Sequence, residues 1–249
     1  MKTAFVITSA IDVDNAYPLT YSAIRSYFGA EDRLKQTLHT IECLNKVSNQ
    51  DTVIYLLDSS VNDNFKTTIN FQPNLKFISV RDIFPHIHQE VTTHPHKTRC
   101  ECLILSEFMK AYSDDLNQFD QIFKISGRYF FDSTFILPNA PHESILFKIP
   151  QCYEWQDQWD LHYLDLRSDQ GDNTIRQYPT TLIGWSTKHN AIFKDLFNCI
   201  AETVIEPGKQ SSDMETLIYF FTRQYKEYII ESNWTIFGWN GVSGQFITY

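Results

Sequence analysis

Short apolar runs rich in β-branched and aromatic residues recur along this chain, and polar turn residues follow them. A run of about four to eight such residues between turns is typical of a buried β-strand. From Glu31 onward, leucine and isoleucine instead recur at helical spacing among charged residues, which predicts an amphipathic helix. Strands that alternate with helices favour a mostly parallel sheet flanked by helices. The first four runs are Ala4–Thr8, Thr52–Leu57, Leu75–Val80 and Gln121–Ser126.

The rest of the chain continues the α/β pattern, and no Pro- or Gly-rich linker interrupts it. A length of 249 residues suits one compact unit, so we expect a single domain over residues 1–249. The pattern predicts a helix at Thr98–Tyr112, strands at Ser144–Ile149 and Thr181–Trp185, a long loop at Gln151–Tyr178, a helix at Asn190–Glu202, a last helix from about Ser212, and a hairpin or ordered flap at Asn233–Tyr249.

Composition excludes several kinds of partner. The net charge of −9 argues against nucleic acid, because neutralising phosphates needs a basic surface. The five cysteines are scattered and odd in number, which favours a reducing compartment over a disulfide framework. Since no run approaches the roughly 18 apolar residues of a membrane span, we expect a cytoplasmic protein without a transmembrane segment.

Three strand ends carry polar groups suited to a ligand, which open parallel sheets bind outside the carboxyl ends of their strands. Thr8-Ser9-Ala10 offers small side chains and backbone N–H donors for a base or phosphate. Asp58-Ser59-Ser60 places a carboxylate where it could accept from a ribose hydroxyl. Polar turns at strand ends are an equally good explanation of both.

The third strand end, Ser126-Gly127-Arg128, gives the sharpest signal. Strand alternation places Lys124 and Ser126 on one face and Ile125 on the other. A buried lysine needs an anionic partner, and a diphosphate would be one, with Arg128 able to bind two of its oxygens. The alternative is that Lys124 pairs with an internal carboxylate and Arg128 is a solvated turn residue.

The segment Lys124-Ile125-Ser126-Gly127-Arg128-Tyr129 resembles a strand end of bacterial and viral glycosyltransferases with the GT-A nucleotide-diphospho-sugar fold. Arg33 with Gln36-Thr37, and the acidic helix start Asp213-Met214-Glu215, fit the same resemblance. It implies transfer of a sugar from a nucleotide-sugar donor to a glycan or lipid-linked acceptor. It also implies a nucleotide-binding half at 1–130 and an acceptor-side half at 131–249. The expected donor-binding residues are Thr8, Ser9, Ala10, Arg33, Asp58, Lys97, Lys124, Ser126, Gly127 and Arg128.

One feature of such enzymes is missing. GT-A enzymes commonly hold a divalent metal such as manganese or magnesium through an Asp-x-Asp motif near this strand end, and no such motif stands there. Either Lys124 and Arg128 stabilise the leaving diphosphate, or a single carboxylate such as Asp132 recruits a metal; we favour the metal-free version. The missing motif also leaves open a non-catalytic nucleotide- or glycan-binding domain. A nucleotidyltransferase fits less well, because the segment after Ile7 is acidic rather than a Gly-rich basic loop.

An inverting transfer needs a carboxylate that deprotonates the acceptor hydroxyl. The resemblance places it at the late helix start, at Asp213 or Glu215. Both also have structural explanations, Glu215 as the capping-box partner of Ser212 and Asp213 as a first-turn charge. The aromatic segment with Trp155 and Trp159 could stack on an acceptor sugar, or its rings could cover the sheet edge.

Two His-x-His pairs offer a rival site. Imidazole ligands for zinc are conceivable there, but Pro85 and Pro95 predict a loop and no cysteine nearby completes a ligand set. Lys97, just before the next helix, is a better candidate as an additional phosphate or sugar contact. The four histidines are His86, His88, His94 and His96.

Overall fold

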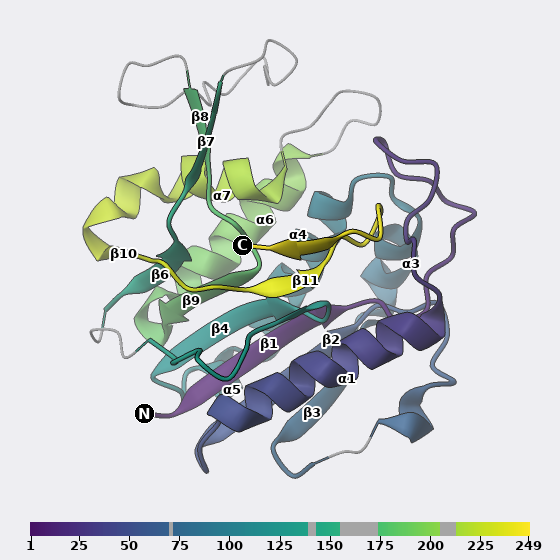
Figure 1. The fold of residues 1–249 in the computed structure, drawn as a ribbon, viewed down its shortest axis with the longest axis horizontal. Coiled ribbons are helices and arrows are strands. Elements are labelled where there is room, and N and C mark those ends of the chain that lie inside the picture. The colour runs from purple at the N-terminus through teal and green to yellow at the C-terminus, as the bar shows by residue number, and fades with distance from the viewer. Residues whose placement is uncertain (70–71, 139–142, 155–173, 205–212) are drawn as a thin grey trace.

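A mixed, largely parallel sheet of seven strands forms the centre of the protein (Figure 1). In spatial order the strands are β10 (Ile229–Ser232), β6 (Ile145–Lys148), β9 (Leu182–Ser186), β4 (Gln121–Ser126), β1 (Thr3–Ser9), β2 (Thr52–Asp58) and β3 (Leu75–Ser79). Strands β4, β1, β2 and β3 are parallel, β9 lies antiparallel between β4 and β6, and β10 pairs with β6 in parallel. This computed structural model describes residues 1–69, 72–138, 143–154, 174–204 and 213–249.

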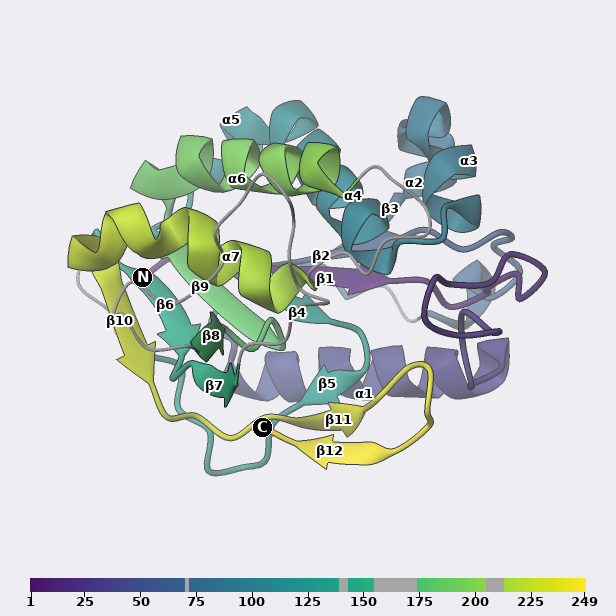
Figure 2. The ribbon, with the colours of Figure 1, turned by 90° about the horizontal axis from the view of Figure 1, so that it is seen from above.

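Helices cover both faces of this sheet (Figure 2). Along the described residues, no helix combines the length and apolar character needed to cross a bilayer. On one face lies α1 (Ala30–Val47), and on the other lie α4 (Lys97–Ala111), α6 (Asn190–Thr203) and α7 (Met214–Thr222). The shorter helices are α2 (Val80–Ile83), α3 (Pro85–Thr93) and α5 (Ser113–Leu116), with 3-10 turns at Lys66–Thr68, Thr187–His189 and Arg223–Tyr228.

Two small antiparallel sheets complete the fold. The C-terminal residues form a hairpin, as the sequence predicted, and it extends to a third strand, β5. The segment predicted as a loop at Gln151–Tyr178 instead begins and ends in strands that pair with each other, and the second of these strands packs against α7 with Ile175 buried. These strands are β5 (Tyr129–Phe130), β11 (Phe237–Trp239), β12 (Phe246–Thr248), β7 (Gln151–Glu154) and β8 (Thr174–Gln177).

Strand alternation builds the two cores. On β1, Ala4 and Val6 pack into the core beneath α4 and α6, while Phe5 and Ile7 pack into the core beneath α1. All four side chains are buried, which is why the run is apolar throughout rather than alternating. Burying a phenylalanine of this kind contributes about 1.5–3 kcal/mol. The apolar runs in the sequence therefore mark strands covered on both faces.

The register brings the three polar strand ends together. Ser9 at the end of β1 lies opposite Asp58 at the end of β2, and Thr8 lies opposite Ser126 at the end of β4. Since all three strands are parallel, their carboxyl ends meet at one edge of the sheet.

The first part of the histidine-rich segment, with His86 and His88, is a helix rather than the predicted loop, whereas His94 and His96 lie in the connection that follows it. Pro85 is the first residue of α3. The backbone N–H that proline lacks would have no hydrogen-bond partner within the helix at this first position, so its absence costs nothing. The second proline, Pro95, lies in the short connection to α4. Pro85 therefore starts a helix instead of preventing one.

Candidate functional site

A pocket opens at the carboxyl ends of β1 and β4, beside the first turns of α1 and α4. Most of the predicted donor-binding residues line it, although they come from four separate segments. Residues from the loop after β1, from α3 and from the C-terminal turn complete the wall. The lining consists of Thr8, Ser9, Ala10, Asp12, Val13, Asp14, Leu19, Arg25, Arg33, Ser59, Val61, Val91, Thr92, Lys97, Cys100, Glu101, Ile104, Ser126, Arg128 and Gly241.

In the part of the chain that the structure describes, four cations line this pocket, and three of them, Arg33, Lys97 and Arg128, are linked by mutual repulsion. Arg33, on α1, donates from Nε to the carbonyl oxygen of Ala10 and from Nη1 to Ser26 Oγ at 3.0 Å. Arg128 is 7% exposed, and its Nη1 donates to the Trp239 carbonyl oxygen at 3.4 Å. Within the described part of the chain, none of the three forms an ion pair with a carboxylate.

Mutual repulsion shows how close these cations are. The positive charge of Arg128, together with burial, lowers the pKa of Lys97 to about 7. Burial and the same Arg128 charge lower the pKa of Arg33 to about 9. A cluster of cations at this cost is suited to an anion with more than one charge, because such an anion offsets their repulsion and raises the lowered pKa values of Lys97 and Arg33.

Lys124 has a different environment. Its side chain is 1% exposed, and Nζ lies 2.6 Å from Glu101 Oε1 on α4 and donates to the Thr180 carbonyl oxygen at 3.2 Å. It does not line the pocket. The internal carboxylate that the sequence left as an alternative is therefore present, although Lys124 and Ser126 share a face as predicted.

Glu101 ties this buried pair to the pocket wall. Its Oε1 also accepts a hydrogen bond from Thr8 Oγ1 at 2.7 Å. Burial alone would raise its pKa, but the charges of Lys124 and Lys97 and these hydrogen bonds lower it to about 2. Glu101 is therefore an anion at neutral pH, and Lys124 neutralises it.

Asp58 and Gly127 position the strand ends rather than lining the pocket. The buried Asp58 carboxylate accepts from the backbone N–H of Ile11 at 3.1 Å and of Ser60 at 3.0 Å, so it fixes the loop after β1. A Cβ on Gly127 would lie 2.9 Å from Thr37 Oγ1, so only glycine lets α1 approach the β4 turn this closely.

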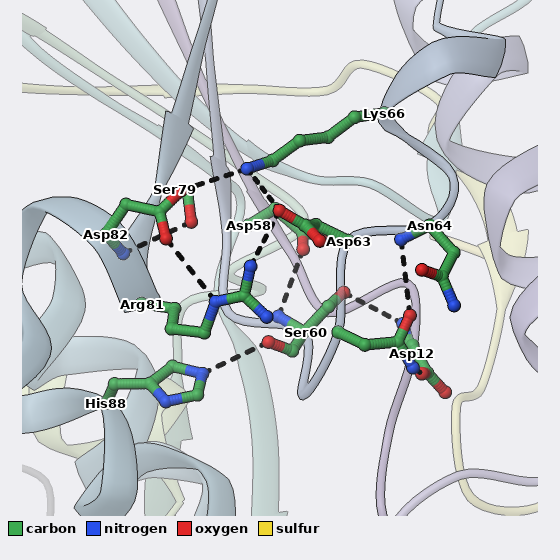
Figure 3. A network of polar contacts seen from close by, with 11 residues as sticks. Asp12, Asp58, Ser60, Asp63, Asn64, Lys66, Ser79, Arg81, Asp82 and His88 are labelled. Atoms are coloured by element: carbon green, nitrogen blue, oxygen red, sulfur yellow. Dashed lines mark hydrogen bonds and ion pairs between the residues drawn. The ribbon is translucent and has the colours of Figure 1, made fainter.

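The loop after β2 forms the opposite wall, and a polar network holds it (Figure 3). Asp63 pairs with Lys66 at 2.5 Å and with Arg81 on α2 at 2.6 Å. Ser60 links this loop to the loop after β1, because its Oγ accepts from the Asp12 backbone N–H at 2.8 Å. Its carbonyl oxygen lies 3.1 Å from His88 Nε2 on α3. The wall is thereby attached to both neighbouring elements.

Asp213 and Glu215 at the start of α7 have separate roles. The predicted capping box is wrong for Glu215, and Ser212 lies outside the described residues. Asp213 is the N-cap, accepting from the Thr216 backbone N–H at 2.8 Å. Glu215 faces inward and accepts from Thr180 Oγ1 at 2.5 Å. Burial and the nearby Asp213 raise the pKa of Glu215 to about 7.

Glu215 is electrostatically connected to the pocket. The Thr180 residue that donates to it also accepts from Lys124, and the Glu215 charge acts on Lys97. Tyr153 on β7 lies near both carboxylates. Burial raises the pKa of its hydroxyl, and the charges of Asp213 and Glu215 raise it further. The predicted acceptor residues Trp155 and Trp159 lie outside the described residues. A carboxylate with a pKa of about 7 can accept a proton at neutral pH.

The histidines have protein partners of their own. His86 Nε2 lies 3.2 Å from Glu107 Oε2, and His94 Nδ1 accepts from the His96 backbone N–H at 3.2 Å. Over the described ranges, no three His, Cys, Asp or Glu side chains gather where they could hold a metal ion. Asp132, the single carboxylate considered for metal recruitment, accepts from Thr134 and does not line the pocket.

Several pocket residues were missed in the sequence. Glu101 follows Lys97 by four residues on one helix, so the two share a face, and this spacing was a usable signal. Arg25 is held by carbonyl oxygens, including that of His94 at 2.8 Å. Gly241 lines the pocket because the C-terminal turn packs there, and no local sequence pattern predicts such a contact.

No known protein family and no curated protein sequence matches this chain. The assignment of a function therefore depends on the geometry and charge of this pocket.

Proposed function

We propose that this protein is a glycosyltransferase with a GT-A-like fold, which moves a sugar from a nucleotide-diphosphate donor to a glycan or lipid-linked acceptor. The observation that carries the proposal is the convergence of Arg33, Lys97 and Arg128, without carboxylate partners among the described residues, at the carboxyl ends of β1 and β4. Cations that form no ion pair with a described carboxylate, at this edge of the sheet, suit the diphosphate of a nucleotide sugar.

In this proposal the cations act on the leaving group. Negative charge develops on the diphosphate as the bond to the sugar breaks, and fixed positive charges stabilise it. Arg128 and Lys97 bind the phosphate oxygens, while Arg33 also fixes the Ala10 carbonyl beside them. Lys124 contributes indirectly, because it neutralises Glu101, which would otherwise repel the donor.

Glu215 is the proposed general base for an inverting transfer, taking the proton of the acceptor hydroxyl. Its pKa of about 7 leaves a useful fraction ionised at neutral pH. The described carboxylates do not form a metal-binding set, so no step is assigned to a divalent ion.

A thermal-shift screen against UDP, GDP, CMP, dTDP and their sugars, with and without manganese, tests the donor site. A ligand at about 100 times its dissociation constant should stabilise the protein by roughly 2.7 kcal/mol. The shift should shrink by about half or more in Arg128→Ala and persist in full in Arg223→Ala, whose guanidinium stacks on Phe220. Absence of a shift with every nucleotide would refute the proposed donor site.

Turnover of the donor found in this way tests catalysis. We expect Glu215→Gln to retain nucleotide binding and to slow transfer by about 10²–10⁴-fold. Binding without turnover in the wild-type protein, over a range of glycan and lipid-linked acceptors, would instead favour the non-catalytic nucleotide-binding domain.

A further inference from the structure

The turn between β11 and β12 packs directly on the guanidinium of Arg128. The Arg128 Nη1 donates to the carbonyl oxygen of Trp239, and the Trp239 backbone N–H donates to the Arg128 carbonyl oxygen at 3.4 Å. The guanidinium lies 5.8 Å from the centre of the Tyr129 ring. The segment that follows β11 thus determines where the charge of Arg128 lies.

Gly241 is the point of closest approach in this turn. It is buried and lines the pocket, and a Cβ placed on it would overlap Arg128 Nη1. The turn is also held from the other side, since the Gly241 carbonyl oxygen accepts from the Tyr27 backbone N–H at 2.8 Å. A side chain at this position would therefore push on the guanidinium rather than move the turn away.

We propose that Gly241 is a positioning residue, whose missing side chain lets the C-terminal turn hold the Arg128 guanidinium toward a diphosphate in the pocket. This inference rests on the proposed function, because it needs an anion to bind beside Arg128. It makes the C-terminal hairpin part of the anion site, although the hairpin is more than a hundred residues from the β4 turn in sequence.

The test is pyrophosphate binding, measured by isothermal titration calorimetry on the full chain. Gly241→Ala should weaken binding at least about tenfold, the effect of losing one charge-assisted contact. Gly29→Ala is the matched control, because a Cβ there meets nothing within 4 Å. In Arg128→Ala, adding Gly241→Ala should change the affinity less than about twofold, since the contact is already gone.

A second variant covers the case in which Gly241→Ala fails to fold. The double variant Arg128→Lys with Gly241→Ala replaces the planar fork by a slender ammonium, so it should fold and bind pyrophosphate more tightly than Arg128→Ala. The inference is overturned if Gly241→Ala binds like the wild type, or if its effect adds fully to that of Arg128→Ala. Wild-type protein that binds no pyrophosphate would overturn the anion site itself, and this inference with it.

Discussion

Two groups of basic side chains lie at the same end of the sheet and differ in what neutralises them. Lys124 is buried against Glu101 at 2.6 Å, beneath α4. Arg33, Lys97 and Arg128 line the pocket beside it, and across the described ranges none has a carboxylate within ion-pair distance. Glu101 connects the two groups, because it pairs with Lys124 and also lines the pocket.

The difference separates the cation that stabilises the fold from the cations that are available to bind a ligand. Burying a charge without a partner costs free energy, so such a group lowers stability unless something binds it. The lowered pKa values of Lys97 and Arg33 record that cost. Stability sacrificed at a site is typical of function, because binding restores it. Mutations should separate the two groups.

Breaking the ion pair between Lys124 and Glu101 should have the largest effect, and this effect should be a loss of stability. Lys124→Met leaves Glu101, on α4, without its ion-pair partner, and we expect a loss of about 3 kcal/mol in the free energy of unfolding. Urea denaturation measures it. The paired variant Lys124→Met with Glu101→Gln should recover much of the loss, because no lone charge remains. A Lys124→Met protein as stable as the wild type, but unable to bind nucleotide, would place Lys124 with the ligand instead.

Removing a cation that has no ion pair with a described carboxylate should mainly weaken ligand binding and leave the stability of the fold nearly unchanged. Arg128→Ala should weaken nucleotide binding by about 1.5–3 kcal/mol, the contribution of hydrogen bonds to a charged group. Its free energy of unfolding should change by less than about 1 kcal/mol, because the substitution also relieves repulsion with Lys97 and Arg33. Calorimetry and urea denaturation on one preparation give both numbers. A large loss of stability with unchanged binding would contradict the distinction.

Much of the fold could be predicted from the sequence, because its strands carry local signals. The runs that became β1, β2 and β4 are buried on both faces, so apolar character alone marks them, whereas β3 at the sheet edge exposes Lys76. Pro85 led to the wrong prediction of a loop. Proline breaks a helix when it lies in the interior but is well accommodated at the first position, so its effect depends on where the helix begins. β10 and the β7–β8 pair are short and partly exposed, and such strands depend on their partners for stability.

The site could be predicted only in part, for a physical reason. Strand ends and the register of parallel strands place Thr8, Ser9 and Ser126 together, and this follows from the sequence. The partner of Lys124 does not, because Glu101 comes from a helix whose rotation on the sheet is set by packing. The contact of Gly241 with Arg128 is likewise a tertiary result. Sequence reasoning therefore found Arg33, Lys97, Lys124 and Arg128 but not Arg25, and it could not decide which cation was paired.

The pH dependence of binding sharpens the comparison further. Arg128, burial and Arg33 lower the pKa of free Lys97 to about 7, and a bound anion raises it again, so binding takes up a proton. Affinity should therefore fall as pH rises above about 7, by up to tenfold per pH unit. Lys97→Met should lose this slope. Titration of the ligand affects both proteins equally, so the difference between their slopes reports Lys97 alone. Parallel slopes would show that Lys97 is already charged in the empty site.

The smallest expected effect concerns the carboxylates, which show the same contrast on one helix start. Asp213 is satisfied by the Thr216 backbone N–H and by Gln177 Nε2 at 2.9 Å, whereas Glu215 faces the buried lysine region. Asp213→Ala should therefore cost about 1 kcal/mol in the free energy of unfolding, as the loss of an N-cap does. Asp213→Asn keeps the capping oxygen and is the control. The transfer rate of Asp213→Asn should stay close to that of the wild type, and a loss as large as that of Glu215→Gln would make Asp213 the base.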